Sequence, residues 1–253
     1  MDRSAMLPDF PRPLLFAHRG LNRKFLENTI SSFQAALDAG VPGIELDVHL
    51  TSDGKLVVFH DDTTGRIERR ARPDEPARDL PLEGSTLAEL RRLSIGAQIP
   101  LLDEIFEEFG SRPYYDIELK SRSASDTGLA SKVAATIRAF GLEKRCVVSS
   151  FNPFALRHFR RAEPGIPIGI IWSRSRELYW FLRHGEGALI ANVDFLKPEA
   201  SLVPHLPLYL RLSGKPVIPW TVNDPKTACD LVARGACGII SDEADVIREA
   251  LGT

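Results

Sequence analysis

Acidic residues occur inside two short apolar stretches of the sequence. Glu45 and Asp47 lie two positions apart and therefore share one face of a strand, and Glu118 occupies a second stretch of this kind. Three carboxylates in one low-dielectric space repel one another unless a cation binds or their pKa values rise. Hard oxygen ligands without cysteine predict Mg²⁺ or Ca²⁺ rather than zinc. The alternative is a structural ion network, with Arg19 and Lys120 as partners of the two carboxylates on the first stretch.

Two histidines also end apolar runs. His18 ends the first run of the chain, and His60 ends a run that follows a predicted turn. Two imidazoles beside one site can divide the work, one accepting a proton from the nucleophile and the other protonating the leaving group. The alternative is that each only hydrogen-bonds to the backbone. His49 shares a face with Glu45 and Asp47, but it falls beyond the predicted strand and is not expected to be a ligand.

Arg19 and Lys120 add positive charge next to these groups. A planar bidentate donor, a point charge and a metal ion together suit the oxygens of a phosphoryl group. The residue types therefore predict a phosphate ester as substrate. No Gly-rich P-loop is present in the sequence, so nucleoside triphosphate binding of that kind has no support.

The elements that must position these residues alternate along the chain. Short apolar, β-branched runs predict buried strands, and amphipathic stretches between them predict helices. This alternation indicates a mostly parallel sheet. The predicted strands are 14–17, 44–48, 56–59, 115–119, 147–149, 168–171, 193–196, 217–220 and 238–240. The predicted helices are 27–39, 101–109, 127–140, 153–162, 174–184, 202–212, 225–233 and 244–251.

Nine predicted strands are one too many for a (β/α)8 barrel. Residues 51–54, Thr-Ser-Asp-Gly, are typical of a hairpin turn, and the connection is too short for a parallel crossover. The strand at 56–59 should therefore run antiparallel, which leaves eight parallel strands. We predict a single α/β domain over 1–253, a TIM barrel with a small insertion after its second strand. The insertion, 49–98, should stand above the C-terminal face and contain one short helix near 86–93.

Length and composition are those of an ordinary globular protein. The 253 residues include 32 Lys and Arg against 34 Asp and Glu, a net charge of −2 that argues against nonspecific nucleic-acid binding. Three cysteines without C-x-x-C spacing predict buried thiols in a reducing compartment. The N-terminus has no apolar signal-peptide core, and no apolar run approaches the about 20 residues that cross a bilayer. We expect a cytoplasmic protein without stable membrane insertion.

Short motifs follow one another from His18 nearly to the C-terminus. They are His18-Arg19-Gly20, Glu27-Asn28-Thr29, Ile44-Glu45-Leu46-Asp47-Val48, Thr51 with Asp53-Gly54, Val57-Val58 with His60-Asp61, Ile99-Pro100-Leu101-Leu102-Asp103-Glu104, Asp116-Ile117-Glu118-Leu119-Lys120, Ser149-Ser150-Phe151, Trp220-Thr221-Val222-Asn223 and Gly238-Ile239-Ile240-Ser241-Asp242. Each motif alone is weak, but the ordered set is highly specific. The chain resembles the glycerophosphodiester phosphodiesterases, specifically their smaller cytosolic kind.

This resemblance implies a TIM barrel with an insertion after strand two, which agrees with the strand count. It also implies one divalent cation held by Glu45, Asp47 and Glu118. The same resemblance implies that His18 and His60 form the acid–base pair.

Substrate contacts are implied at three further positions. Arg19 and Lys120 would hold the phosphate, and Trp220 would line the pocket on the glycerol side, although a barrel-core aromatic is an equal alternative for Trp220. Asn28 would either orient a site residue or simply belong to the start of a helix. Two positions depart from the family pattern. Leu26 replaces a common proline, and Lys197 replaces a different polar residue before Pro198.

The implied activity is hydrolysis of a glycerophosphodiester to glycerol 3-phosphate and an alcohol. The sequence is compatible with direct attack by water and with attack by the glycerol 2-hydroxyl to give a cyclic phosphate. A lysophospholipase D acting on lysophospholipids is an alternative, but it needs an apolar trough or a membrane-contacting insertion, and the insertion is charged. A catalytically silent barrel that binds phosphodiesters or a partner protein is a third hypothesis.

Overall fold

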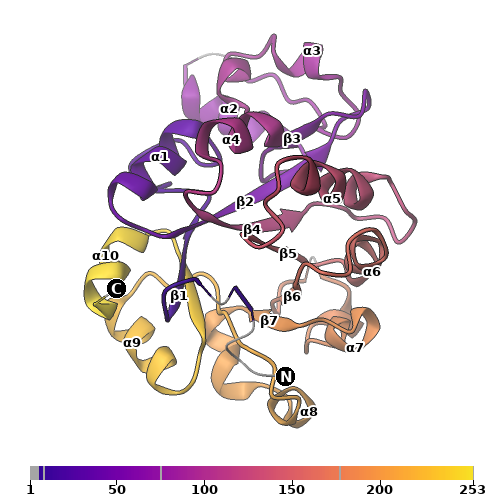
Figure 1. The fold of residues 1–253 in the computed structure, drawn as a ribbon. Helices are drawn as coiled ribbons and strands as arrows, with labels where there is room; N and C mark the ends of the chain where they lie inside the picture. The colour runs from indigo at the N-terminus through magenta and orange to yellow at the C-terminus, as the bar shows by residue number, and fades with distance from the viewer. Residues whose placement is uncertain (1–5, 8, 75, 177, 253) are drawn as a thin grey trace.

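A curled parallel sheet forms the centre of the molecule (Figure 1). The computed structural model describes all residues except 1–5, 8, 75, 177 and 253. Seven strands run in the order β7-β6-β5-β4-β2-β1-β8, and β3 pairs antiparallel with β2, as the turn at 51–54 predicted. The strands are β1 (Leu14–His18), β2 (Gly43–Leu50), β3 (Leu56–Val58), β4 (Tyr114–Leu119), β5 (Cys146–Ser150), β6 (Ile168–Trp172), β7 (Phe195–Pro198) and β8 (Gly238–Ser241).

The eighth parallel position of the barrel is occupied by residues 217–220. This segment was predicted to be a regular strand, but it forms only isolated parallel bridges, Leu196 with Val217 and Glu199 with Trp220. Its backbone still joins both neighbours, because Ile218 N donates to Leu196 O at 2.8 Å on β7 and Ile240 N of β8 donates to Pro219 O at 3.1 Å. Proline has no N–H and interrupts the ladder. The segment nevertheless closes the barrel between β7 and β8.

Helices surround the sheet and follow the predicted alternation (Figure 1). They are α1 (Ile30–Asp38), α4 (Leu102–Phe109), α5 (Leu129–Ala139), α6 (Pro153–Ala162), α7 (Gly187–Ala191), α8 (Leu208–Leu212), α9 (Pro225–Ala233) and α10 (Ala244–Leu251). Two predictions were wrong. In the described part of 174–184 the only helical turn is the 3₁₀ helix η2 (Trp180–Leu182), and 202–212 is divided into η3 (Ala200–His205) and α8. Pro207 stands between these last two, where its ring prevents a continuous helix.

Large apolar side chains fill the end of the barrel at which the parallel strands begin. Phe16, Phe195 and Ile240 pack there with Phe10 of the N-terminal segment, whose ring stacks on Tyr114 at 4.2 Å between centroids. Two glycines make room for these rings: a Cβ on Gly43 would lie 2.7 Å from the Phe16 ring, and one on Gly169 would overlap Phe195. This end is closed by apolar packing, so the polar residues gather at the other end.

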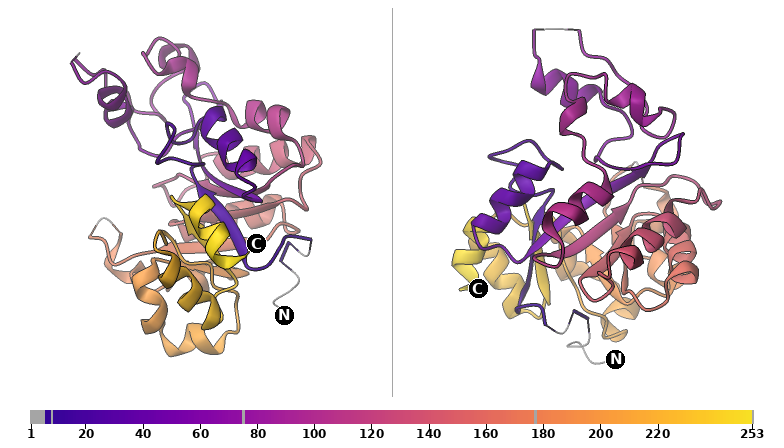
Figure 2. Two further views of the ribbon diagram at one scale, coloured as in Figure 1. Left: turned by 90° about the vertical axis from the view of Figure 1, so that its left-hand side faces the viewer. Right: turned by 45° about the horizontal axis from the view of Figure 1, so that its top comes forward.

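The insertion has a small core of its own. Val57, Phe59, Ile67, Leu90 and Ile99 are buried together there. Besides the predicted short helix, found as α3 (Leu87–Leu90), it contains α2 (Gly65–Ala71) and the 3₁₀ helix η1 (Gly96–Gln98). Helix α2 was missed because its sequence is rich in arginine and has little apolar periodicity. Both views of Figure 2 show the insertion standing away from the barrel body.

Two smaller predictions can be compared with the structure. Cys146 is buried and Cys237 is half-buried, but Cys229 is exposed on α9, so the prediction of three buried thiols was wrong at that position. Among the described residues, no helix is both long and apolar enough to cross a membrane.

Candidate active site

The three carboxylates predicted as metal ligands meet at the carboxyl ends of β2 and β4. The parallel register pairs Asp47 with Glu118, and Glu45 lies one pleat before Asp47 on the same face. Glu45, Asp47 and Glu118 are only 2%, 1% and 6% exposed. One oxygen of each lies within 4.8 Å of the others. The donor set consists of hard, negatively charged oxygens, which fits a divalent cation such as Mg²⁺ or Ca²⁺.

Burial affects these carboxylates in different ways. Burial and the adjacent charge of Asp47 raise the pKa of Glu45 well above its usual value. Burial also acts to raise the pKa of Asp47, but the charges of Lys120 and Arg19 outweigh it and lower that pKa well below its usual value. Burial and the charge of Asp47 therefore disfavour an ionised Glu45, and a bound cation would favour its ionised form.

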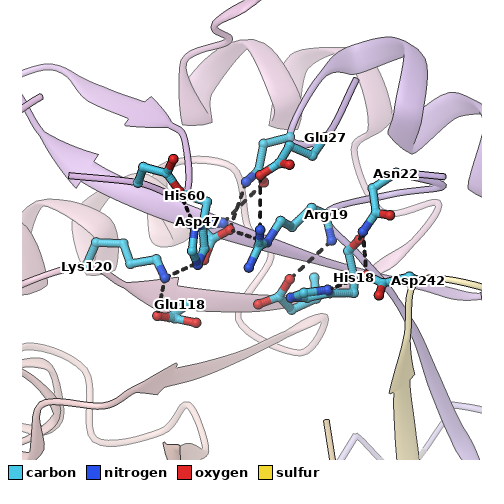
Figure 3. A network of polar contacts seen from close by, with 12 residues as sticks. His18, Arg19, Asn22, Glu27, Asp47, His60, Glu118, Lys120 and Asp242 are labelled. Atoms are coloured by element: carbon cyan, nitrogen blue, oxygen red, sulfur yellow. Dashed lines mark hydrogen bonds and ion pairs between the residues drawn. The ribbon is translucent and has the colours of Figure 1, made fainter. Parts of the chain in front are cut away.

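Arg19 and Lys120 both contact Asp47 (Figure 3). Lys120 Nζ lies 2.9 Å from Asp47 Oδ1 and 2.6 Å from Glu118 Oε1. Arg19 Nε lies 3.3 Å from Asp47 Oδ2, while its Nη1 donates to Glu27 Oε1 at 3.0 Å. The structural ion network expected as an alternative is therefore present at Asp47. Glu45 differs, because it accepts a hydrogen bond from the Arg19 backbone N–H and not from the guanidinium.

The turn after β1 aims Arg19 into the site. Arg19 and Gly20 have φ values of 56° and 80°, in the left-handed region that favours glycine. A Cβ on Gly20 would lie 2.4 Å from Ser32 Oγ and 2.6 Å from the Ser32 carbonyl carbon. Only glycine fits between this turn and α1, which explains the His18-Arg19-Gly20 sequence.

The Glu27-Asn28-Thr29 motif serves both purposes that the sequence suggested, through different residues. Asn28 Nδ2 donates to Asp47 Oδ2 at 2.8 Å, so it orients a buried carboxylate of the site. The next residue, Thr29, caps α1 by accepting a hydrogen bond from Ser32 N.

His18 lies at the end of β1 and is hydrogen-bonded to Asp242, which directly follows β8. The distance from Nδ1 to Asp242 Oδ1 is 2.7 Å, and Asn22 and Asn223 also donate to this carboxylate. A carboxylate only accepts, so Nδ1 carries the proton and Nε2 is free in the neutral ring. Burial lowers the pKa of His18, although the bond to Asp242 opposes this. His18 is therefore biased towards the form that can accept a proton at Nε2.

His60 is held from the insertion side. Its Nδ1 lies 2.6 Å from Asp61 Oδ1, and Arg66 donates to both oxygens of Asp61 at 2.6 and 2.9 Å. Arg66 also donates to both oxygens of Glu27, at 2.9 and 2.7 Å, and Glu27 in turn accepts from Arg19. A chain of charged hydrogen bonds through Asp61, Arg66 and Glu27 thus connects His60 to Arg19.

The structure places His49 differently from the sequence-based expectation. His49 was expected beyond the second strand, but it belongs to β2 and is 1% exposed, because β2 continues to Leu50. Burial lowers the pKa of His49 to about 4.

Trp220 is half-buried, with Nε1 donating to Lys197 O at 3.0 Å and its ring edge-on to Phe151. Trp220 therefore packs as a barrel aromatic and keeps a partly open face.

Sequence reasoning missed two cations that matter to the site. Arg66 belongs to the charged insertion and was not singled out, yet it bridges Glu27 and Asp61. Lys197 is 1% exposed inside the barrel, where Nζ lies 2.7 Å from Asp116 Oδ2 and 2.9 Å from Ser149 Oγ. The even spacing of Asp116 and Glu118 on one strand face indicated that Asp116 points inward, which was the available signal for a buried basic partner.

Comparisons with known proteins agree with this geometry. The profile of the Glycerophosphoryl diester phosphodiesterase family matches residues 18–246. A glycerophosphodiester phosphodiesterase of Caldanaerobacter subterraneus is 31% identical over 93% of this chain and 96% of its own. The structure of a glycerophosphodiester phosphodiesterase from Thermotoga maritima has a TM-score of 0.73 and 27% identity, covering 93% of this chain and 97% of that one.

A second similar structure contains a ligand. It is an Oleispira antarctica phosphodiesterase in complex with the product sn-glycerol-3-phosphate, with a TM-score of 0.73 and 25% identity over 97% of this chain and 98% of that chain. The family profile covers the candidate site residues from His18 to Asp242, and the fold agrees over nearly the full length. The chain belongs to the glycerophosphoryl diester phosphodiesterase family.

Proposed function

We propose that this protein hydrolyses glycerophosphodiesters to glycerol 3-phosphate and an alcohol, with His18 and His60 as its acid–base pair. The single observation that carries the proposal is the pairing of each histidine, through Nδ1, with a carboxylate: His18 with Asp242 and His60 with Asp61. This arrangement leaves Nε2 of each ring available for proton transfer. The product in the Oleispira antarctica complex, sn-glycerol-3-phosphate, supports the same substrate class.

Metal dependence is part of the proposal. Glu45, Asp47 and Glu118 would hold one Mg²⁺ or Ca²⁺, for which their buried oxygen donor set is suited. A bound divalent cation supplies positive charge that offsets the charge developing on the phosphoryl oxygens.

The two histidines differ in a way that suggests their roles. Burial lowers the pKa of His18, which favours the neutral ring, so we assign it the acceptance of a proton from the attacking hydroxyl. His60 would then give a proton to the departing alkoxide. Two ionised carboxylates beside the imidazoles stabilise the imidazolium form that each ring must adopt once in the cycle.

Substrate binding is assigned to cations and one aromatic. Arg19 offers a planar guanidinium with several donors, and Lys120 offers a compact charge, at opposite sides of Asp47. They would bind the non-bridging oxygens of the phosphate. Trp220, with its partly open face near the end of the closing segment, would contact the glycerol moiety.

Release of glycerol 3-phosphate from a panel of diesters, including glycerophosphocholine, tests the proposal. We expect turnover that EDTA abolishes and that Mg²⁺ or Ca²⁺ restores. His18→Ala and His60→Ala should each lower kcat by about 10²–10⁴-fold. His205→Ala, at an exposed histidine of η3, is the matched control and should behave as wild type.

Two outcomes would contradict the assignment. Activity that persists in EDTA, or in both histidine variants, would exclude the proposed chemistry. A protein that binds metal but turns over no diester of the panel would instead indicate a silent phosphodiester-binding barrel.

A further inference from the structure

The loop after β6 exposes three consecutive aromatic residues. Tyr179, Trp180 and Phe181 are 66%, 76% and 40% exposed, in and beside the 3₁₀ helix η2. We call residues 173–184 the aromatic loop. Exposed single apolar residues are common, but a contiguous group of large rings on a surface usually marks an interaction site.

The three rings contact one another. The Tyr179 and Phe181 rings stack with centroids 5.6 Å apart, and the Trp180 ring meets Phe181 edge-on at 5.8 Å. Their apolar surface is therefore only partly shielded by mutual contact.

The backbone of the aromatic loop is held so that the rings face outward. Arg183 donates through Nε to Leu178 O at 2.9 Å and through Nη2 to Arg176 O at 3.1 Å. Leu182 is buried, and Tyr209 Oη of α8 donates to His184 O at 3.1 Å. Outward presentation is thus a property of the folded loop, fixed by contacts at its middle and its end.

The position of the loop is tied to the active site. It follows the carboxyl end of β6, and the catalytic candidates follow the carboxyl ends of β1, β2 and β4 in the same parallel sheet. All these ends lie on one face of a barrel. The left view of Figure 2 shows this loop, in orange at the left, and the insertion projecting towards the same side of the molecule. The loop and the insertion therefore project from the face on which the site opens.

Basic side chains accompany the aromatic rings. Arg174 and Arg176 are exposed at the start of the loop, and residues 173–184 contain three arginines and one glutamate. On the insertion, Arg69 and Arg70 of α2 are also exposed. Positive charge beside tryptophan and tyrosine suits the interface of a phospholipid layer, where the rings enter the head-group region and guanidinium groups meet phosphate.

We propose that the aromatic loop docks this protein reversibly on phospholipid surfaces that contain anionic head groups. Trp180 and Tyr179 would enter the head-group layer while Arg174 and Arg176 bind lipid phosphates. Docking there turns the open face of the barrel towards the layer in which phosphodiester head groups lie. The inference concerns binding alone, so it does not depend on the proposed hydrolysis.

Vesicle co-sedimentation tests the proposal directly. The full chain is mixed with vesicles of 70% phosphatidylcholine and 30% phosphatidylglycerol, and with pure phosphatidylcholine vesicles, at low and high salt. We expect binding to the mixed vesicles, at least tenfold weaker binding to pure phosphatidylcholine, and a decrease with salt, because the arginine contribution is screened. Trp180 should report binding by a blue shift of tryptophan emission.

A matched pair of variants assigns the binding to the loop. Tyr179→Ser/Trp180→Ser/Phe181→Ser should reduce vesicle binding at least tenfold, with an unchanged melting temperature as the check on folding. Leu212→Ser is the control, because Leu212 is also 76% exposed but lies on α8. Arg174→Gln/Arg176→Gln should remove the preference for the anionic vesicles.

Several results would overturn the inference. These are absence of the wild-type protein from the vesicle pellet, equal binding by the triple aromatic variant, and equal loss of binding in Leu212→Ser. Sedimentation velocity without lipid tests whether the aromatic rings instead form a dimer interface. A dimer that the triple variant converts to a monomer, together with no vesicle binding, would show that the rings instead contact a second copy of the chain.

Discussion

The two histidines of the active site are held by different regions of the molecule. On the barrel side, His18 and Asp242 follow strands of the central sheet, and the side chain of His18 is 12% exposed. On the insertion side, His60 is 33% exposed, and its partner Asp61 is held by Arg66, which is itself 44% exposed. The two carboxylates are similarly part-buried, at 20% and 23% exposed, so the difference lies in the histidines and in Arg66, whose charged contacts are nearer to solvent.

The barrel and the insertion thus each hold one of the two histidines. Burial makes each hydrogen bond on the barrel side costly to lose, because a desolvated polar group has no water to replace its partner. On the insertion side, solvent and salt screen the charges, so each contact contributes less. Equal roles in proton transfer therefore do not imply equal sensitivity to mutation.

The largest expected difference concerns the two carboxylates. Asp242→Asn removes the acceptor that fixes the Nδ1 proton of His18 and should lower kcat by about 10²–10⁴-fold, as loss of the correct tautomer does in other enzymes. Asp61→Asn should lower kcat by at most about fivefold, since His60 and Arg66 are more open to solvent than His18, and a solvated charged pair contributes about 1 kcal/mol or less. Steady-state kinetics with glycerophosphocholine measures both. Similar losses in the two variants would show that exposure does not distinguish the two sides.

A substitution of Lys197 tests the buried ion pair that Lys197 forms with Asp116 inside the barrel. Lys197→Met leaves Asp116 buried without its cation and should reduce the free energy of unfolding by about 3–5 kcal/mol, as measured by urea denaturation. Lys197→Met/Asp116→Leu removes both charges and should recover much of that loss. If the double variant is no more stable than the single one, then the uncompensated charge is not the cause.

Arg66 provides the corresponding test on the insertion side. Arg66→Met breaks the contacts to Glu27 and Asp61, yet it should reduce the free energy of unfolding by no more than about 1 kcal/mol because the guanidinium is partly solvated. Urea denaturation at low and high salt measures this, and the difference from wild type should shrink with salt. A loss as large as that of Lys197→Met would mean that the insertion side is as rigid as the barrel side.

The smallest expected effect is the pH dependence of stability on the barrel side. The pKa of His18 is below its ordinary value of 6.5 in the folded chain, so the unfolded chain takes up this proton first. Stability should therefore decrease as the pH falls below about 6.5. Asp242 has a lowered pKa, so its contribution is present at higher pH and is lost only below about pH 4.

Urea denaturation between about pH 3 and 8 separates the two groups. His18→Gln should lessen the decrease below about pH 6.5, to which the buried His49 also contributes, while the loss below about pH 4 remains. An unchanged slope in His18→Gln would assign the pH dependence to another group.

Much of the fold followed from local patterns. Apolar runs such as 44–48 and 115–119 must be buried on both faces, and the turn at 51–54 leaves no room for a crossover, so parallel and antiparallel strands could be distinguished. Residues 217–220 were less predictable. They contain a strand-like pattern next to prolines, and only their neighbours β7 and β8 decide that they close the barrel without a regular ladder.

The site was predictable where a residue follows a strand. Glu45, Asp47 and Glu118 share a face by spacing alone, and the register of β2 with β4 brings them together. Arg66 and the exposed aromatic loop could not be assigned in this way. A charged residue in an irregular segment gives no periodic signal, and its partner depends on how the segment folds back over the barrel.

By itself, the sequence determined the alternation of strands and helices, the turn that separates the insertion, and the residues that carry charge to the strand ends. These are local properties, because spacing sets which face a side chain occupies and turn residues set where a strand stops. The tertiary structure decided which charges meet. Asp242 reaches His18 across 224 positions and Lys197 reaches Asp116 across 81. Pairing over such separations depends on barrel closure and burial, which no local pattern encodes.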